Sequence, residues 1–335
     1  MTFKFENAYV KDTDVIVGPI EKEGPLKSYF KNYLKDFYFG SKTWEQAETK
    51  MAFETINNLV KKTKIDLIIG GDLLNQITAT SFAVRKFNIP FLGIYNACAT
   101  STEGIIMASI LVDKGLANNV IVNVSSNNNA AEKQFRYPIE YGGPKPKIST
   151  FTVTGSAGVI ISNEKSKIRV ESGTIGKIVD FKIKDAYEMG PVMAPACGDT
   201  IYEHLKSLNR KPDYYDLILS GDLGEYGKKI LKDYMKKKYK INLKNYNDCG
   251  VIIYNTKKQS VYSGGSGPAC APLVTYTYIL DQMKKKNLKK VLIVATGALH
   301  STTTVNQKET IPAIAHAISL EVLKWYIYMH LFFQE

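Results

Sequence analysis

The chain has 335 residues, 44% of them hydrophobic, which suits either one large α/β unit or two domains of average size. Its four cysteines form no C-x-x-C pair and have no metal-ligand spacing with the four histidines, so neither a zinc site nor a disulfide framework is indicated. Much of the net charge of +12 comes from lysines in helical surface patterns, notably at 228–240 and 284–290. This distribution favours ordinary solvated helix faces over a patch that binds acidic headgroups. Nucleic-acid binding is disfavoured, because the sequence contains no recognised nucleic-acid module.

The first third of the chain alternates between the two periodicities of secondary structure. The N-terminus carries charges where a signal peptide would need an apolar core, so we expect synthesis in the cytoplasm without export. Apolar spacing then predicts helices at 44–62, 78–87 and 100–114, and strands at 66–72, 89–95 and 120–124. Such alternation is typical of a mostly parallel sheet that helices cover on both faces.

Cys98 lies between the strand at 89–95 and the helix at 100–114. Thr100 and Glu103 have the spacing of a capping box, in which each side chain bonds the other residue's backbone amide. The field of a helix N-terminus favours an anion, so it would either acidify the Cys98 thiol or hold a bound carboxylate. The alternative is that Cys98 is a small buried apolar residue.

Residues 125–146 are polar and rich in turn-forming residues, which predicts a long loop, and a loop of that length inside a compact domain is more often functional than idle. Paired strands are expected over 150–162. The second half of the chain then repeats the first. DLILSGDL at 216–223 matches DLIIGGDL at 66–73 in six of eight positions, and VLIVATG at 291–297 echoes VIVNVSS at 120–126. These echoes predict two similar α/β halves, at 1–170 and 171–321, followed by an apolar aromatic tail at 322–335.

A set of motifs spans residues 1–321. They are EKEGPL at 21–26, GDLLNQ at 71–76, ACATS at 97–101, EKQFRYPIEYGGPKP at 132–146, VTGSAGVIIS at 153–162, MAPACGDTI at 193–201, YDLILSGDL at 215–223, NDCG at 247–250, GGSGPAC at 264–270 and VATGAL at 294–299. Together they resemble the stage V sporulation protein AD family, within the thiolase and ketoacyl-synthase superfamily. The resemblance implies an α/β thiolase-like fold of two pseudo-symmetric halves in a layered αβαβα arrangement.

Thiolase-type catalysis needs a nucleophilic thiolate and a nearby histidine or asparagine. The superfamily usually places that histidine in a Gly-His-Pro turn, whereas this chain has Ser-Gly-Gly-Ser-Gly at 263–267. The position of the nucleophile, Cys98, is therefore kept without its usual base, and we expect no catalysis. The alternative is an acyltransferase in which His300 serves as an unconventional base. His204 and His316 fall in apparent helical segments and are expected to be structural.

The resemblance implies instead a protein that binds dipicolinic acid or its calcium chelate. Loop position and charge make eleven residues the candidate ligand contacts: Asp72, Asn75, Gln76, Cys98, Ser101, Asn127, Arg136, Tyr137, Asp248, Gly265 and Gly267. Asp72 and Asp248 are the oxygen donors expected for calcium that enters with the ligand. No cofactor or resident metal is expected. Arg136 has a second interpretation, in which it only pins the long segment through Glu132 or Glu140.

The implied partners are the other stage V sporulation A membrane proteins, an anionic membrane surface and a second copy of the chain. We expect a peripheral protein at the forespore or spore inner membrane without a transmembrane helix, because the tail is too short to span a bilayer. The tail either lies in an interface, packs on a partner or is irregular. A scaffold with an empty pocket is the third functional alternative.

Overall fold

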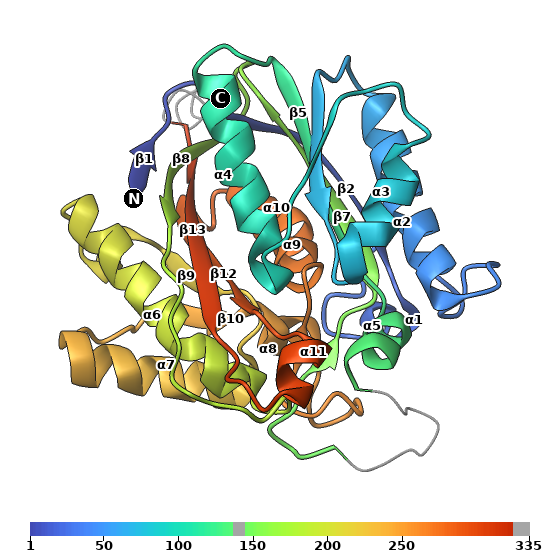
Figure 1. The fold of residues 1–335 in the computed structure, drawn as a ribbon. Helices are drawn as coiled ribbons and strands as arrows, with labels where there is room; N and C mark the ends of the chain where they lie inside the picture. The colour runs from blue at the N-terminus through green and yellow to red at the C-terminus, as the bar shows by residue number, and fades with distance from the viewer. Residues whose placement is uncertain (137–144, 324–335) are drawn as a thin grey trace.

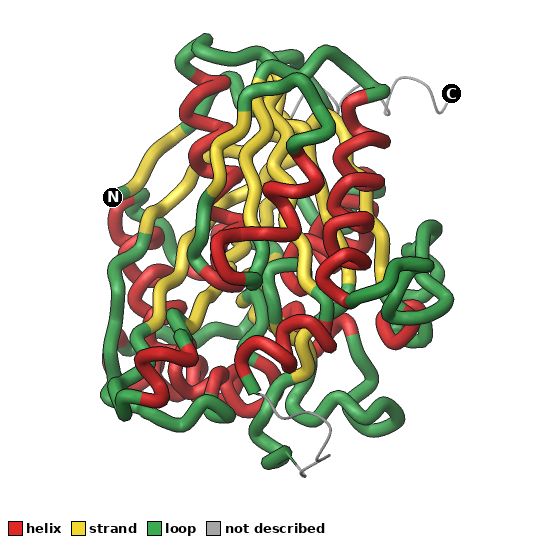
Figure 2. Tube along the Cα trace, turned by 45° about the vertical axis from the view of Figure 1, so that its right-hand side comes forward, coloured by secondary structure: helices red, strands yellow, loops and turns green. Residues whose placement is uncertain are grey.

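The computed structural model describes residues 1–136 and 145–323, which fold into alternating layers of helix and sheet (Figure 1). The layers contain α4 (Thr100–Asp113), α9 (Cys270–Val274) and α10 (Leu280–Lys284) in the middle, α2 (Trp44–Val60) and α3 (Thr78–Val84) on one side, and α6 (Met189–Ser207) and α7 (Gly224–Tyr239) on the other. Figure 2, a view turned by 45°, shows the strands running between these helices. The predicted αβαβα arrangement is confirmed.

Two halves of the sheet have the same strand order and the same directions. The first half runs β4 (Phe91–Gly93), β3 (Leu67–Gly71), β5 (Asn119–Ser126), β7 (Gly155–Ser162) and β2 (Tyr9–Val17). The second runs β10 (Tyr246–Asp248), β9 (Leu217–Ser220), β12 (Lys290–Ala298), β13 (Ala313–Val322) and β8 (Ile168–Ile175). In each half the first three strands are parallel and the last two follow antiparallel. The halves meet where Tyr9 of β2 pairs with Arg169 of β8.

The remaining elements are short. They are β1 (Thr2–Lys4), which pairs with β8, the two-stranded sheet of β6 (Phe151–Thr152) and β11 (Gly265–Ser266), helices α1 (Pro19–Lys22), α5 (Asn128–Phe135), α8 (Cys249–Ile253) and α11 (Thr302–Asn306), the 3-10 turns η1 (Asn75–Ile77), η2 (Ala97–Ala99) and η4 (Pro212–Tyr214), and the π-helical turn η5 (Thr275–Ile279). Within the described residues, no helix is both long enough and apolar enough to cross a membrane.

The repeated aspartates show why the two halves share a sequence pattern. Asp66, just before β3, accepts hydrogen bonds from the amides of Asn118 and Asn119 at 2.7 and 3.1 Å. Asp216, just before β9, accepts from the amides of Lys289 and Lys290 at 2.5 and 2.8 Å. Each carboxylate therefore ties the start of one strand to the start of its parallel neighbour, which fixes the same register in both halves.

The middle layer explains the apolar character of the helix after Cys98. Helix α4 contacts strands of both halves of the sheet, so water reaches little of its surface. Ile105, Ile106, Ala108 and Val112 on this helix are all less than 5% exposed. A helix packed on both sides needs apolar residues all round, and it therefore shows only weak amphipathic periodicity.

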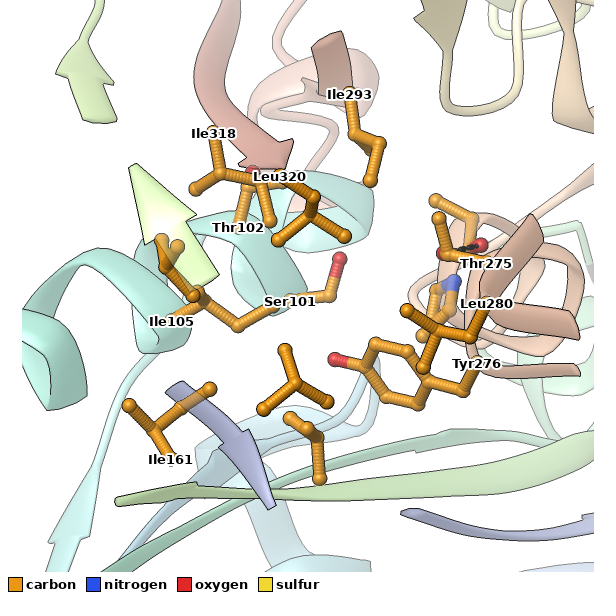
Figure 3. A pocket seen from close by; sticks show the side chains of 15 residues that line it. Ser101, Thr102, Ile105, Ile161, Thr275, Tyr276, Leu280, Ile293, Ile318 and Leu320 are labelled. Atoms are coloured by element: carbon orange, nitrogen blue, oxygen red, sulfur yellow. Dashed lines mark hydrogen bonds between the residues drawn. The ribbon is translucent and has the colours of Figure 1, made fainter. Parts of the chain in front are cut away.

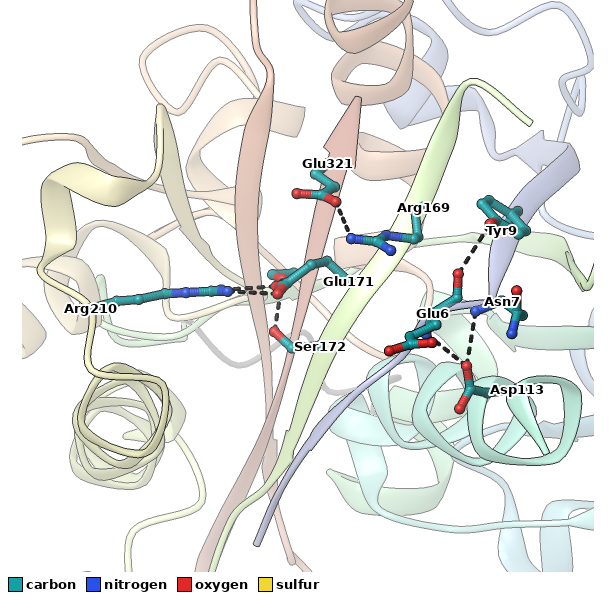
Figure 4. Close-up of polar contacts among 10 residues, drawn as sticks. Glu6, Asn7, Tyr9, Asp113, Arg169, Glu171, Ser172, Arg210 and Glu321 are labelled. Carbon is teal, nitrogen blue, oxygen red and sulfur yellow. Dashed lines mark hydrogen bonds and ion pairs between the residues drawn. The ribbon is translucent and has the colours of Figure 1, made fainter. Parts of the chain in front are cut away.

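Ion pairs tie β8 to other segments of the second half of the molecule (Figure 4). Arg169 of β8 binds Glu321 of β13. Arg210, in the turn after α6, holds Glu171 of β8 with two nitrogens at 2.6 and 2.8 Å. Ser319 of β13 donates to the same carboxylate at 2.6 Å, so Glu171 connects three segments that are distant in sequence.

Several local predictions differ from the structure. The segment 125–146 is not all loop, because α5 forms within it and its capping residue Asn127 accepts from the amides of Asn129 and Ala130. The strands expected over 150–162 do not pair with each other, since β6 pairs with β11 and β7 with β2 and β5. His316 lies on β13 rather than on a helix. The predicted boundary at residues 170 and 171 falls inside β8, and the tail lies outside the described residues from 324 onward.

Candidate functional site

A strained turn places Cys98 at the start of α4. Ala97 has a φ of 49°, a conformation that costs free energy in a residue with a Cβ, and residues 97–99 form a 3-10 turn that continues into the helix. The Thr100 hydroxyl donates to the carbonyl of Ala97 at 2.7 Å and accepts from the amide of Asn96 at 3.0 Å. Glu103 bonds the Asn96 side chain. The predicted capping box is therefore wrong, because the 3-10 turn occupies the place where it would form.

The sulfur of Cys98 contacts a carboxyl group from the other half of the molecule. Asp222, which follows β9, forms a hydrogen bond with the Cys98 thiol, and the amide of Gly267 also points to the sulfur. Burial raises the pKa of Cys98 well above its ordinary value, and the neighbouring Asp222 carboxyl raises it further. This shift disfavours the first of the two uses expected for the helix mouth, acidification of the thiol, and leaves the second, a bound carboxylate.

Asp222 is itself held by groups from strand β12 and from the loop after β11. One carboxyl oxygen accepts from the Thr296 hydroxyl at 2.5 Å and the other accepts from the Gly267 amide at 3.2 Å. Burial raises the pKa of Asp222 to about 7, although the hydrogen bonds from Thr296 and Cys98 partly oppose this shift. The charge of this buried carboxyl therefore changes near neutral pH.

Cys98 opens into a small pocket, with about 50 Å³ of free space, that both halves line. Its apolar and aromatic lining consists of Leu73, Tyr95, Ala97, Ala131, Phe135, Met189, Met193 and Ala298. Its polar lining consists of Cys98, Arg136, Thr152, Ser266 and His300. A mostly apolar cleft with a few convergent polar groups is the usual form of a small-molecule site.

Two residues of the pocket lining each carry a buried nitrogen atom that has no hydrogen-bond partner among the described residues. They are Nε of Arg136 and Nε2 of His300. Arg136 uses another nitrogen to bind Glu132 at 2.6 Å, and Lys145 binds the second oxygen of the same carboxylate at 2.6 Å, which leaves this group of three with a net positive charge. Burial and the nearby Arg136 lower the pKa of His300 to about 4, so its imidazole is neutral at pH 7. The pocket thus offers an unused guanidinium donor, although the Arg136–Glu132 bond predicted as an alternative is also present.

Three of the sequence-predicted residues are buried outside the pocket lining, where their side chains accept hydrogen bonds from backbone amides. Asp72 accepts from the amides of Leu74 and Thr80, and Asp248 accepts from the amides of Leu223 and Gly224. Asn127 caps α5. Across residues 1–136 and 145–323, no group of three or more His, Cys, Asp and Glu is placed to hold a metal ion.

The other predicted residues are divided between the pocket and the surface. Asn75 and Gln76 are exposed in η1. Gly265 is buried in β11 beside the pocket-lining Ser266, and Gly267 points its amide at Cys98 and Asp222. Tyr137 lies outside the described residues.

Ser101 faces a second cavity, between α4 and the π-helical turn (Figure 3). The Ser101 and Tyr276 hydroxyls both point into this apolar space, and no described residue bonds the Tyr276 hydroxyl, although the residue is only 9% exposed. An unpaired buried hydroxyl lowers stability.

The Tyr276→Phe variant is therefore expected to gain about 1 kcal/mol in its free energy of unfolding, because it removes an unsatisfied donor. Urea unfolding measures this change. The matched variant is Tyr215→Phe, whose hydroxyl bonds His204 at 2.7 Å and should cost stability when removed. A loss in Tyr276→Phe equal to that in Tyr215→Phe would contradict the expectation.

Sequence reasoning missed Asp222 altogether and gave His300 only a minor role. The signal for Asp222 was present, because it is the second aspartate of the repeated motif and corresponds to Asp72.

Comparison with known proteins decides the family. The family model described as Stage V sporulation protein AD (SpoVAD) matches residues 1–321. The chain belongs to this family. It is 46% identical to the Stage V sporulation protein AD of Bacillus subtilis (strain 168) over 327 residues, which cover 96% of each chain.

Solved structures with the same fold come from thiolase-like enzymes. The 3-oxoacyl-[acyl-carrier-protein] synthase III of Aquifex aeolicus VF5 is 13% identical, with a TM-score of 0.54 over 94% of this chain and 99% of that one. The acetamide-bound OleA of Xanthomonas campestris is 13% identical, with a TM-score of 0.56 over 94% and 100% of the two chains. At this identity the likeness shows the fold alone, so this SpoVAD-family chain has a thiolase-like fold.

Proposed function

We propose that the protein is a non-catalytic binding protein for dipicolinic acid, free or as its calcium chelate, and that the ligand occupies the Cys98 pocket. The observation that carries the proposal is Arg136, which lines the pocket and whose buried Nε has no partner among the described residues. A guanidinium with an unused donor is well suited to a carboxylate. Membership of a sporulation family agrees with a ligand of the spore.

The lining of the pocket suits a small planar aromatic acid. Phe135 and Tyr95 offer ring surfaces, and the neutral His300 offers a nitrogen that adds no charge. Since Asp72 and Asp248 are engaged elsewhere, calcium would reach the site already chelated by the ligand.

The partners follow from the same proposal. The other stage V sporulation A membrane proteins would receive or deliver the ligand at the forespore or spore inner membrane. The lysines of α7 would face acidic headgroups, and a second copy of the chain would form a homodimer.

A titration of the full chain with dipicolinate, with and without calcium, tests the proposal. Arg136→Gln is expected to weaken binding at least tenfold, because a charged donor is lost, whereas Cys98→Ala should bind within about threefold of the wild type. The control is Arg85→Gln, which removes a guanidinium stacked on Phe82 outside the pocket. Equal binding by Arg136→Gln and Arg85→Gln would contradict the assignment.

The hydrogen bond between Asp222 and Cys98 supports a second candidate, an acyltransferase in which Asp222 rather than His300 takes the thiol proton. The raised pKa of Cys98 opposes this mechanism, because the thiolate is costly to form. Incubation with acyl-CoA followed by mass spectrometry separates the candidates: acylation of Cys98 supports the enzyme. If neither binding nor acylation occurs, the protein is a scaffold with an empty pocket.

A further inference from the structure

We propose that Asp222 makes binding in the Cys98 pocket proton-linked, so that a dianionic ligand is taken up together with one proton. The inference rests on the proposed function, since it concerns the charge of the ligand in that pocket.

The first observation is the position of the Asp222 carboxyl beside the pocket. Asp222 is 1% exposed, and it bonds the thiol of the pocket-lining Cys98 and the amide of Gly267, which follows the pocket-lining Ser266. A charge on this carboxyl lies directly behind Cys98, with little water to screen it. An ionised Asp222 therefore repels a ligand carboxylate, whereas a protonated Asp222 does not.

The second observation comes from comparing Asp222 with Asp72, the residue at the same position of the repeated motif. Asp72, its counterpart in the first half, uses its oxygens to accept amides of its own loop and of α3. In the second half Gly224, the counterpart of Leu74, donates its amide to Asp248 of β10 instead, as does the neighbouring Leu223. Asp222 therefore does not bond the amides of its own loop as Asp72 does. Its carboxyl instead bonds Thr296, Gly267 and Cys98. A purely structural aspartate would not need this rearrangement.

The groups around Asp222 leave it as the one that changes charge at about pH 7. Burial raises the pKa of Cys98 well above its ordinary value, so the thiol stays neutral, and burial lowers the pKa of His300 to about 4. Burial raises the pKa of Asp248 to about 6, so this group ionises first and disfavours a second charge on Asp222. The buried thiols of Cys197, Cys249 and Cys270 near these carboxyls all have pKa values well above the ordinary range.

The sign of the effect follows. Below about pH 7 Asp222 is protonated and the anion binds without a proton. Above that pH the carboxyl must take up a proton when the ligand enters, so the affinity falls by up to tenfold for each further pH unit. Ligand carboxyls are already ionised throughout this range and add no slope of their own.

Calorimetric titration of the full chain with dipicolinate at pH 6, 7, 8 and 9 tests the inference, in two buffers of different ionisation enthalpy so that protons are counted. For the wild type we expect uptake of close to one proton at pH 8 and a dissociation constant that rises several-fold from pH 7 to 8. Asp222→Asn, a permanently neutral side chain, should bind with the wild-type affinity of pH 6 at every pH. Asp72→Asn is the matched control and should keep the wild-type slope.

Binding without proton uptake, or an unchanged slope in Asp222→Asn, overturns the inference and leaves the proposed function standing. Absence of wild-type binding at every pH overturns the proposed function and this inference with it. The proton count of the wild type decides the question even if the Asp222→Asn variant does not fold.

Discussion

Replacing Arg210 with glutamine is expected to lower the free energy of unfolding by roughly 3 kcal/mol, because it leaves the buried carboxylate of Glu171 without its cation. Both side chains of the pair are about 10% exposed. Burial alone would raise the pKa of Glu171, but the hydrogen bonds from Arg210 and Ser319 outweigh it and hold the pKa at about 2. Urea unfolding of the wild type and the variant at pH 7 measures the loss.

The pH dependence gives this prediction a second readout. The folded pKa of Glu171 lies below its ordinary value of 4.5, so the stabilisation is fully present above that pH and is lost as the pH falls toward about 2. Arg210→Gln should lose most of its deficit in acid, where the carboxyl of Glu171 becomes neutral. Lys182→Gln breaks an exposed pair with Asp180 and should show no measurable change. A deficit of the same size at pH 7 and pH 3 would contradict the account.

The duplicated architecture could be predicted because the repeat lies in residues that make the fold. Asp66 and Asp216 each fix the register of two parallel strands, so both halves keep them, and the sequence shows them at the same place in each motif. The helix after Cys98 could also be predicted from the sequence, because a helix packed on both faces forms a long run of mainly apolar residues.

The site was harder to predict, because its contacts join residues that are far apart in the chain. Asp222 meets Cys98 across the two halves, and the sequence gives no sign that Asp222 and Asp72 have different partners. The capping box failed for a related reason: the 3-10 turn that begins at Ala97 depends on a strained φ, which residue types alone do not reveal.

Replacing Gly297 with alanine is expected to damage the site and the fold together. A Cβ at this position would lie 2.3 Å from the carbonyl oxygen of Asn96 and 3.3 Å from the amide of Ala99, on both sides of the Cys98 turn. These atoms belong to the backbone, so either β12 or the turn must move. We expect a loss of about 2 kcal/mol in the free energy of unfolding. On the proposed function, we also expect dipicolinate affinity to fall more than tenfold, because Ala298 and Cys98 both line the pocket.

Gly115→Ala is the control that separates the effect of a steric clash at Gly297 from the effect of replacing any glycine by alanine. Gly115 has a φ of 70° with nothing within 4 Å of its missing Cβ, so alanine there costs about 1 kcal/mol of backbone strain and leaves the pocket untouched. If Gly297→Ala binds dipicolinate as well as Gly115→Ala does, the end of β12 does not hold the Cys98 turn. If it binds poorly while its unfolding free energy is unchanged, the turn has moved without loss of packing, and β12 positions the ligand site more than it supports the sheet.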